Sequence, residues 1–244
     1  MKCLTEDYIS ENGIIIPKDS VDYIRCSDNS SVWKYEKNGQ EYAFKEFFPD
    51  RRCYCLKYDT YTKMRDLPLL NIIKPLESYK KVSNTHEKAL DGYLMDYIPH
   101  IEEFCYIDYQ ISALLENIRN LEKDIECLSN SNMIMHDVGP RNTLIGDIDH
   151  KLNIIDIDMY YYDRLTEKKE VLRQNRKQLF YLIRLMLFRG IIHDEDLAGK
   201  KEEIREFLKE YFNADETNES LYTRVENLFR NYETPKEFML ERKF

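Results

Sequence analysis

The sequence predicts an α+β protein of two lobes, with an N-terminal antiparallel sheet and one helix followed by a mainly helical C-terminal half. Up to about residue 100, runs of β-branched and aromatic residues are separated by turn residues, as is typical of strands. From Asp108 onward, apolar residues recur at helical spacing instead. The 244 residues, 43% of them hydrophobic, suffice to bury a core in one large domain or two small lobes.

Five strands and one helix are predicted in the first half. The first three strands cover residues 21–27, 32–36 and 41–48, and Lys37-Asn38-Gly39 is typical of a hairpin turn between the last two. Two further strands are predicted at 72–82 and 89–98. The helix is expected from about residue 52 to residue 65, because Pro68 follows it and would end it.

Helices dominate the second half. Their apolar positions recur at three- and four-residue spacing, at Leu114, Leu115, Ile118, Leu121, Ile125 and Leu128, and again at Leu172, Leu179, Ile183, Met186 and Leu187. Short strands are expected at 143–145 and 152–157, and two or three more helices complete the chain. A boundary near 96–100, where Pro99 ends a strand, divides the chain into lobes 1–98 and 99–244.

Composition excludes several classes of partner. The formal charge of −9 comes without any long Lys/Arg run, so neither nucleic acid nor an anionic membrane is expected as a partner. No apolar stretch approaches the roughly 20 residues of a membrane span, and the N-terminus turns acidic before a signal peptide could form. The close pair Cys53 and Cys55 lacks two further zinc ligands nearby. We therefore expect a protein of a reducing cytosol, in the producing cell or in a host cell.

Polar residues interrupt the apolar strands of the second half. Asp156 follows an apolar strand, and Asp158 lies on the same face if the strand continues. A strand-end Asp that caps a turn explains Asp156 by itself, whereas a buried carboxylate that binds a cation is the functional alternative. Asp137 and Asn142 flank a Gly-Pro turn, which can aim both side chains to one side. Asn142 and Asp156 offer the oxygen ligands that magnesium prefers, and Asp137 could accept a proton from a hydroxyl nucleophile.

A lysine interrupts the first half in the same way. Lys45 faces inward if Ala43 and Phe47 face the core. Such a lysine usually extends its stem and leaves its ammonium group in water, so a functional role requires a phosphate nearby.

Four segments in register resemble the protein-kinase-like fold over roughly residues 21–190. YAFKEF is similar to the V-A-I-K strand, and GYLMDYIP to the strand and hinge that join the lobes. MHDVGPRN is similar to the H-R-D-x-x-x-x-N catalytic loop, and LNIIDID occupies the place of D-F-G.

The resemblance implies roles for the matching residues. Lys45 would hold the α- and β-phosphates of ATP, and Asp137 would position the acceptor hydroxyl. Asn142 and Asp156 would bind Mg²⁺, and Asp158, at the D-F-G glycine position, could be a third metal ligand.

Further nucleotide contacts follow from the same resemblance. Met95 corresponds to the gatekeeper, and Asp96 to Ile98 correspond to the hinge that meets adenine. The phosphate loop corresponds to residues 26–32, which contain no glycine. The remaining positions implied to contact nucleotide are Ser27, Asn29, Ser30, Val32 and Ala43.

The family's partner for the strand lysine is a helix glutamate, but the predicted helix contains none, and Asp59 is its candidate replacement. The missing A-P-E anchor and Asp158 favour small-molecule kinases, whereas the V-A-I-K-like strand and hinge favour protein kinases. The sequence thus predicts an ATP- and Mg²⁺-dependent phosphotransferase acting on protein Ser/Thr hydroxyls. The alternatives are an aminoglycoside- or choline-type kinase and a non-catalytic pseudokinase, which the altered phosphate loop and missing helix glutamate favour.

Overall fold

The computed structural model describes residues 4–48, 56–86, 90–101, 108–188, 204, 207 and 220–240. Cys53, Cys55, Ala89 and the predicted start of the first helix at residue 52 lie outside these residues. The chain divides into two compact units, each described below by itself. Its mixture of a seven-stranded antiparallel sheet with several helices confirms the predicted α+β class.

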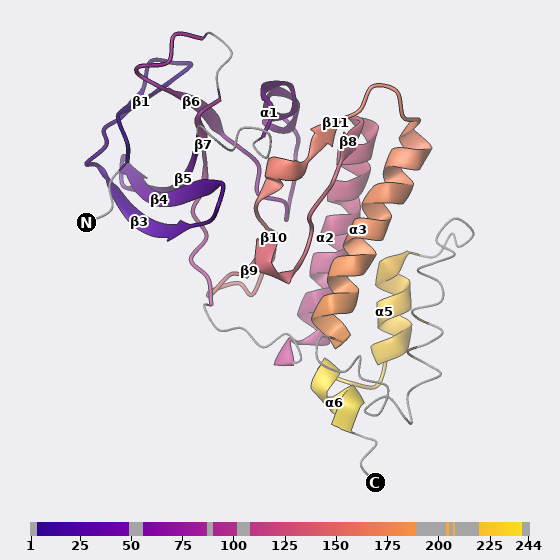
Figure 1. The fold of residues 1–244 in the computed structure, drawn as a ribbon. Helices are drawn as coiled ribbons and strands as arrows, with labels where there is room; N and C mark the ends of the chain where they lie inside the picture. The colour runs from indigo at the N-terminus through magenta and orange to yellow at the C-terminus, as the bar shows by residue number, and fades with distance from the viewer. Residues whose placement is uncertain are drawn as a thin grey trace. The chain divides into compact units, whose positions relative to one another are not determined.

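Unit 1 comprises Met1–Pro68, Ile73–Ile98 and Asp156–Tyr162. Its centre is a curled antiparallel sheet of seven strands in the order β2-β1-β6-β7-β5-β4-β3 (Figure 1). The strands are β1 Tyr8–Ser10, β2 Ile15–Ile16, β3 Val21–Cys26, β4 Ser30–Lys37, β5 Gln40–Phe47, β6 Glu77–Lys81 and β7 Gly92–Asp96.

The five predicted strands are present, and the hairpin at Asn38-Gly39 is confirmed. Both turn residues have positive φ, 56° and 76°, and Lys37 pairs with Gln40 across the two-residue loop. The strand predicted from residue 72 begins only at Glu77, after Pro75, which has no N–H to donate to a ladder. Two N-terminal strands, β1 and β2, were not predicted, since three and two residues are too short to show an alternation.

Strand β5 is buried on both faces over its second half. Phe44 and Glu46 lie on one face, and Phe44 joins the aromatic core formed by the curled sheet. Ala43, Lys45 and Phe47 lie on the other face. One strand thus carries two buried charged side chains in opposite directions.

Unit 2 comprises Leu69–Ile72, Pro99–Ile155 and Asp163–Phe244. Helices α2 (Ile111–Asn130) and α3 (Lys168–Phe188) lie side by side, and α5 (Leu221–Phe229) packs against α2 (Figure 1). Unit 2 also contains the short helix α6 (Pro235–Leu240), the strand β8 (Met133–Ile134) and a hairpin of β9 (Thr143–Ile145) and β10 (Leu152–Ile154). The two predicted long helices are therefore present.

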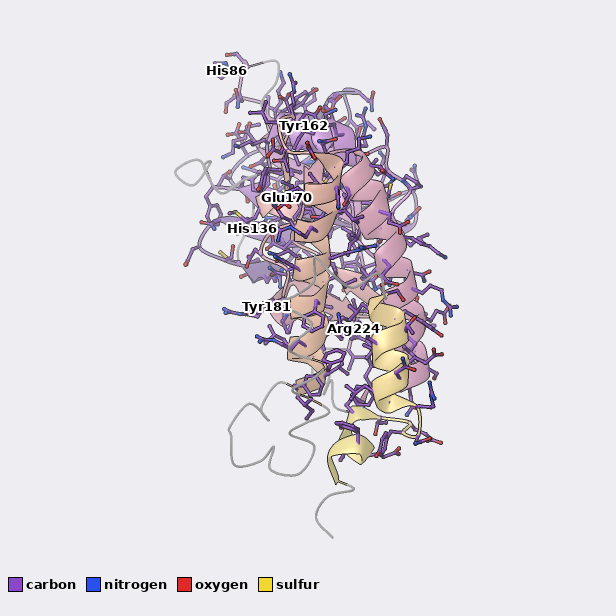
Figure 2. The ribbon with its side chains drawn as sticks, turned by 90° about the vertical axis from the view of Figure 1, so that its right-hand side faces the viewer. His86, His136, Tyr162, Glu170, Tyr181 and Arg224 are labelled. Atoms are coloured by element: carbon purple, nitrogen blue, oxygen red, sulfur yellow. The ribbon has the colours of Figure 1, made fainter. Side chains whose placement is uncertain are left out.

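The C-terminal half of α3 contributes to an aromatic core in unit 2. Phe180 and Phe188 on α3 stack on or meet Phe207, and Phe188 also faces Phe229 on α5. Arg224, labelled on α5 in Figure 2, lies over the rings of Phe180 and Phe207 and donates to the Phe207 carbonyl at 3.0 Å.

A buried polar network fixes β10. The Asp124 carboxylate on α2 accepts the backbone N–H groups of Leu70, Asn71 and Ile72 at 2.7–3.0 Å. The Asn71 amide donates to the Leu152 carbonyl at 2.6 Å, and the Asn71 carbonyl accepts the Ile154 N–H at 2.8 Å. Because these contacts tie residues 70–72 to both α2 and β10, the end of β10 is held in place without a large sheet.

Candidate functional site

Lys45 is the buried charge on which the unit 1 site is built. The residue is 2% exposed, because its strand lies inside the sheet between β4 and β7. Across the ladder Lys45 faces Val32 on β4 and Tyr93 on β7, and Ala43 faces Met95. Directly paired residues share a face of the sheet, so Val32, Ala43, Lys45, Tyr93 and Met95 line one surface.

Two carboxylates of unit 1 bind the Lys45 ammonium group. Its Nζ lies 2.7 Å from Asp156 Oδ1 and 2.6 Å from Asp158 Oδ2. The Tyr93 hydroxyl donates to the other oxygen of Asp158, Oδ1, at 3.1 Å. The structure therefore brings together three of the residues predicted for nucleotide and metal binding, and it adds Tyr93.

The chain reaches this geometry through a turn and not through a longer strand. Asp156 has φ 62°, in the left-handed region, and a 3₁₀ turn η4 (Ile157–Met159) follows. The strand predicted to continue to residue 157 ends at Ile154. Asp156 and Asp158 still reach one cation, but by this turn, so the reasoning from strand alternation was wrong.

The two carboxylates differ in exposure and in pKa. Burial opposes ionisation of Asp156, but the adjacent Lys45 charge outweighs it and lowers the Asp156 pKa. Burial raises the pKa of Asp158 to about 6, with the Asp156 charge adding to the effect and Lys45 opposing it. Burial would lower the pKa of Lys45, yet both carboxylates together raise it.

Asp59 does not pair with Lys45, contrary to the sequence-based expectation. Asp59 is exposed in the first turn of α1 (Tyr58–Met64), whereas Lys45 is buried against Asp156 and Asp158. The buried face of α1 is instead formed by Thr60, Tyr61 and Met64. A short acidic side chain on the exposed face of α1 cannot turn to a buried ammonium group.

The predicted phosphate loop is a tight turn between β3 and β4. The Ser27 hydroxyl accepts the N–H groups of Asn29 and Ser30 at 3.3 and 3.2 Å, and the Ser27 N–H donates to the Ser30 carbonyl at 2.8 Å. Three backbone amides that could have met a phosphate are thus used within the turn.

The predicted hinge residues lie at the end of β7. Asp96 is exposed and pairs with Tyr42, so it points away from the surface of Ala43 and Met95. Ile98 follows the strand and is half-buried.

Asp137 and Asn142 form the site of unit 2. Asp137 has φ 55°, and the turn passes through Gly139 into η3 (Pro140–Asn142). The Asn142 amide nitrogen donates to the Asp137 carbonyl at 2.8 Å and to its carboxylate Oδ2 at 3.3 Å. The loop therefore fixes the two side chains against each other, as the Gly-Pro turn suggested.

Asn175 supports this loop and was not predicted. It lies fully buried on α3, accepts the Met135 N–H at 2.8 Å, and donates to the Met133 carbonyl at 2.9 Å. A second donation goes to Ser129 Oγ on α2 at 2.9 Å. A single Asn within a long polar-apolar helix gives no sequence signal for this role, because its partners lie more than 39 residues away in the chain.

A pocket of about 370 Å³ lies beside the loop. It is lined by the loop residues 137–142 and by Tyr181 and Leu185 of α3. Figure 2 shows Tyr181 toward the end of α3, with Glu170 near the beginning. Asp137 is the acidic member of this lining, and Arg141 is its basic member, so the pocket is not strongly acidic.

Within the described ranges, no three His, Cys, Asp or Glu side chains gather as a metal-binding group. None of the helices that the structure describes has the length and apolar character of a membrane span.

Comparison with models of known protein families and with curated protein sequences gives no match.

Proposed function

We propose that this protein is an ATP- and Mg²⁺-dependent phosphotransferase of protein-kinase-like fold, with a hydroxyl group as acceptor. The observation that carries the proposal is the buried Lys45, held by Asp156 111 residues later in the chain. In the sequence resemblance, these are the phosphate-binding lysine and the D-F-G aspartate. The contact supports the alignment of both motifs at once.

The two metal ligands that the resemblance implies each offer an oxygen donor. Asp156 keeps 30% of its side chain exposed, although one oxygen contacts Lys45. Asn142 uses its amide nitrogen toward Asp137, which leaves the amide oxygen as the metal donor. Magnesium takes one or two protein oxygens and completes its shell with water and substrate phosphates, so each residue, within its own unit, offers a donor of the kind this ion takes. When bound, the ion neutralises charge on the transferring phosphoryl group.

The protein's own residues then supply binding and proton transfer. Lys45 provides a cation for the nucleotide phosphates. The Asp137 carboxylate orients the acceptor hydroxyl and takes its proton as the oxygen bonds to the γ-phosphorus and the bond to the ADP oxygen breaks. Asn142 fixes the Asp137 side chain for this task.

The acceptor we propose is a Ser or Thr hydroxyl on protein. An aminoglycoside or choline-type substrate is cationic and would favour a pocket rich in acidic side chains. The pocket beside Asp137 instead contains Arg141, Tyr181 and Leu185. This lining supports a neutral hydroxyl side chain over a polycation.

A non-catalytic pseudokinase, which would serve as a binding module without turnover, is the second candidate. The turn at Ser27 favours this candidate. The N–H groups of Asn29 and Ser30, which a phosphate loop would offer to the nucleotide, already donate to the Ser27 hydroxyl. The two candidates differ in whether phosphoryl transfer occurs.

Incubation with labelled ATP and Mg²⁺, on the protein itself, generic protein substrates and a panel of small alcohols, separates them. We expect transfer to protein, and a loss of about a hundredfold or more in Asp137→Asn, which removes the proton acceptor. Asp147→Asn, an exposed acid of the same unit, serves as the matched control. Label that persists in Asp137→Asn would refute the assignment, and binding of ATP without any transfer would favour the second candidate.

A further inference from the structure

Asp158 differs from Asp156 in a way that its predicted role as a metal ligand does not explain. Its side chain is only 7% exposed, against 30% for Asp156. Each of its oxygens already has a protein partner, Oδ2 with the Lys45 ammonium group and Oδ1 with the Tyr93 hydroxyl. A carboxylate enclosed in this way is directed at the lysine and not at a hydrated ion.

Lys45 needs such a partner in addition to Asp156. A buried ammonium group without a counter-ion is strongly disfavoured. Asp156 is the more exposed carboxylate and, under the proposed function, also serves the metal ion. Asp158 keeps Lys45 paired when Asp156 turns to other ligands, because it is buried and held by Tyr93 from the neighbouring strand β7.

Helix α1 does not supply the partner. Its acidic residue Asp59 is exposed, and its contacts within unit 1 are of another kind. The Tyr61 hydroxyl accepts the Ser78 N–H at 2.9 Å, and the Lys63 ammonium lies 4.0 Å from the ring centroid of Tyr162. Where the kinase-like pattern expects an acid on the helix, this protein has aromatic and hydroxyl contacts.

We propose that Asp158 is the positioning residue for Lys45, in place of the missing helix carboxylate, and that it is not a metal ligand. This inference rests on the proposed function for the role of Lys45 toward nucleotide. Because Asp158 stands two residues after Asp156, one short segment both anchors the lysine and presents the metal-binding carboxylate. The orientation of Lys45 then does not depend on the position of α1.

The first test measures the coupling of Lys45 and Asp158 without nucleotide. Trp33, the one tryptophan of the chain, is buried in unit 1, so its fluorescence reports melting of that unit. We expect Lys45→Met and Asp158→Asn each to lower the melting temperature, and the double variant to lose less than the sum of the two. Additive losses would overturn the pairing.

The second test measures nucleotide use with MgATP in the full-length protein. Asp158→Asn should raise KM for ATP by about tenfold or more, since Lys45 is left to Asp156 alone, and should change kcat less. Tyr93→Phe, which keeps the ring but loses the hydroxyl donor, should shift KM in the same direction by a smaller factor. Asp66→Asn, an exposed acid just after α1, is the control for loss of one charge.

The outcomes separate this inference from the proposed function. The role of Asp158 would be overturned if KM for ATP were unchanged in Asp158→Asn, or if Asp59→Asn were the variant that raised it. Phosphoryl transfer by the wild type would still support the proposed function in either case. A half-saturating Mg²⁺ concentration that rises in Asp158→Asn while KM for ATP stays constant would show a metal ligand and would also overturn it. Wild-type protein that binds no ATP would refute the proposed function, and non-additive melting temperatures would still support the Lys45–Asp158 pairing.

Discussion

Asn175 offers the sharpest test of how unit 2 holds its loop. Asn175→Ala removes the acceptor of the Met135 N–H and the donor to the Met133 carbonyl, both of buried residues. A buried polar group left without a partner costs about 1–3 kcal/mol, so the two together cost about 2–6 kcal/mol. At about 3 °C per kcal/mol for a domain of this size, the melting temperature should fall by about 6–18 °C.

Two optical signals localise the effect. Far-UV circular dichroism follows the helices, most of which lie in unit 2, whereas Trp33 fluorescence follows unit 1. In Asn175→Ala we expect the melting temperature followed by circular dichroism to fall. The melting temperature followed by Trp33 fluorescence should stay closer to the wild-type value. Asn130→Ala, at an exposed position at the end of α2, is the matched control.

The same variant should affect turnover. Met135 precedes Asp137 by two residues, so loss of its anchor displaces the proposed proton acceptor, and kcat should fall with little change in KM for ATP. The reasoning fails if Asn175→Ala melts like Asn130→Ala, or if the fluorescence transition is the one that moves.

Three further predictions concern stability. Glu46→Gln should destabilise unit 1 by about 1–3 kcal/mol, because the buried carboxylate accepts from Tyr8 and Trp33 and a neutral amide oxygen accepts less strongly. Trp33 fluorescence during denaturation measures this, and no loss would contradict it. Gly39→Ala should cost about 1 kcal/mol by the same assay, because the residue has φ 76° although a Cβ would meet no neighbour; an unchanged midpoint would show that the turn relaxes. Glu122 accepts the Leu221 N–H at 2.7 Å, and burial raises its pKa above the ordinary 4.5. With a raised pKa, the wild type loses stability as pH rises from the unfolded value through the folded value. Glu122→Gln does not titrate, so its melting temperature should rise relative to that of the wild type as pH increases above 4.5. A difference that is constant over this range, or that falls, would contradict the assignment.

Local chemistry explains what the sequence could predict. The turn at Asn38-Gly39 needs positive φ at two positions, and these residue types tolerate it, so the β4–β5 hairpin and the register of Lys45 followed. The periods of α2 and α3 were equally clear, because each helix buries one long stripe.

Contacts distant in the chain could not be predicted. The pairing of Lys45 with Asp158 depends on the left-handed conformation of Asp156, and an Asp gives only a weak signal for it. The anchoring of the Asp137 loop by Asn175, 40 residues from Met135, gives no periodic pattern at all. In both cases the sequence indicated which residues carry charge or polarity but not which partner each one has.

Strand β5 shows why burial by itself does not assign function. Glu46 is as buried as Lys45, but its carboxylate accepts from the Tyr8 hydroxyl at 2.8 Å, the Thr5 hydroxyl at 2.9 Å and the Trp33 indole at 3.2 Å. Those neutral donors satisfy both of its oxygens. Lys45 is instead paired with Asp156, whose side chain is 30% exposed.

The two buried charges therefore lead to opposite expectations. A buried ion pair is a poor way to stabilise a fold, since apolar residues of equal volume often do as well or better. For Glu46 we expect substitution to change the stability of unit 1 and to leave KM for ATP in the folded protein nearly unchanged. For Lys45 we expect substitution to affect nucleotide binding more than stability. The loss of nucleotide affinity should be large and should persist at temperatures where the variant is fully folded. Measuring KM for ATP in Lys45→Met and Glu46→Gln at such a temperature tests this difference. We expect a large increase in Lys45→Met and little change in Glu46→Gln.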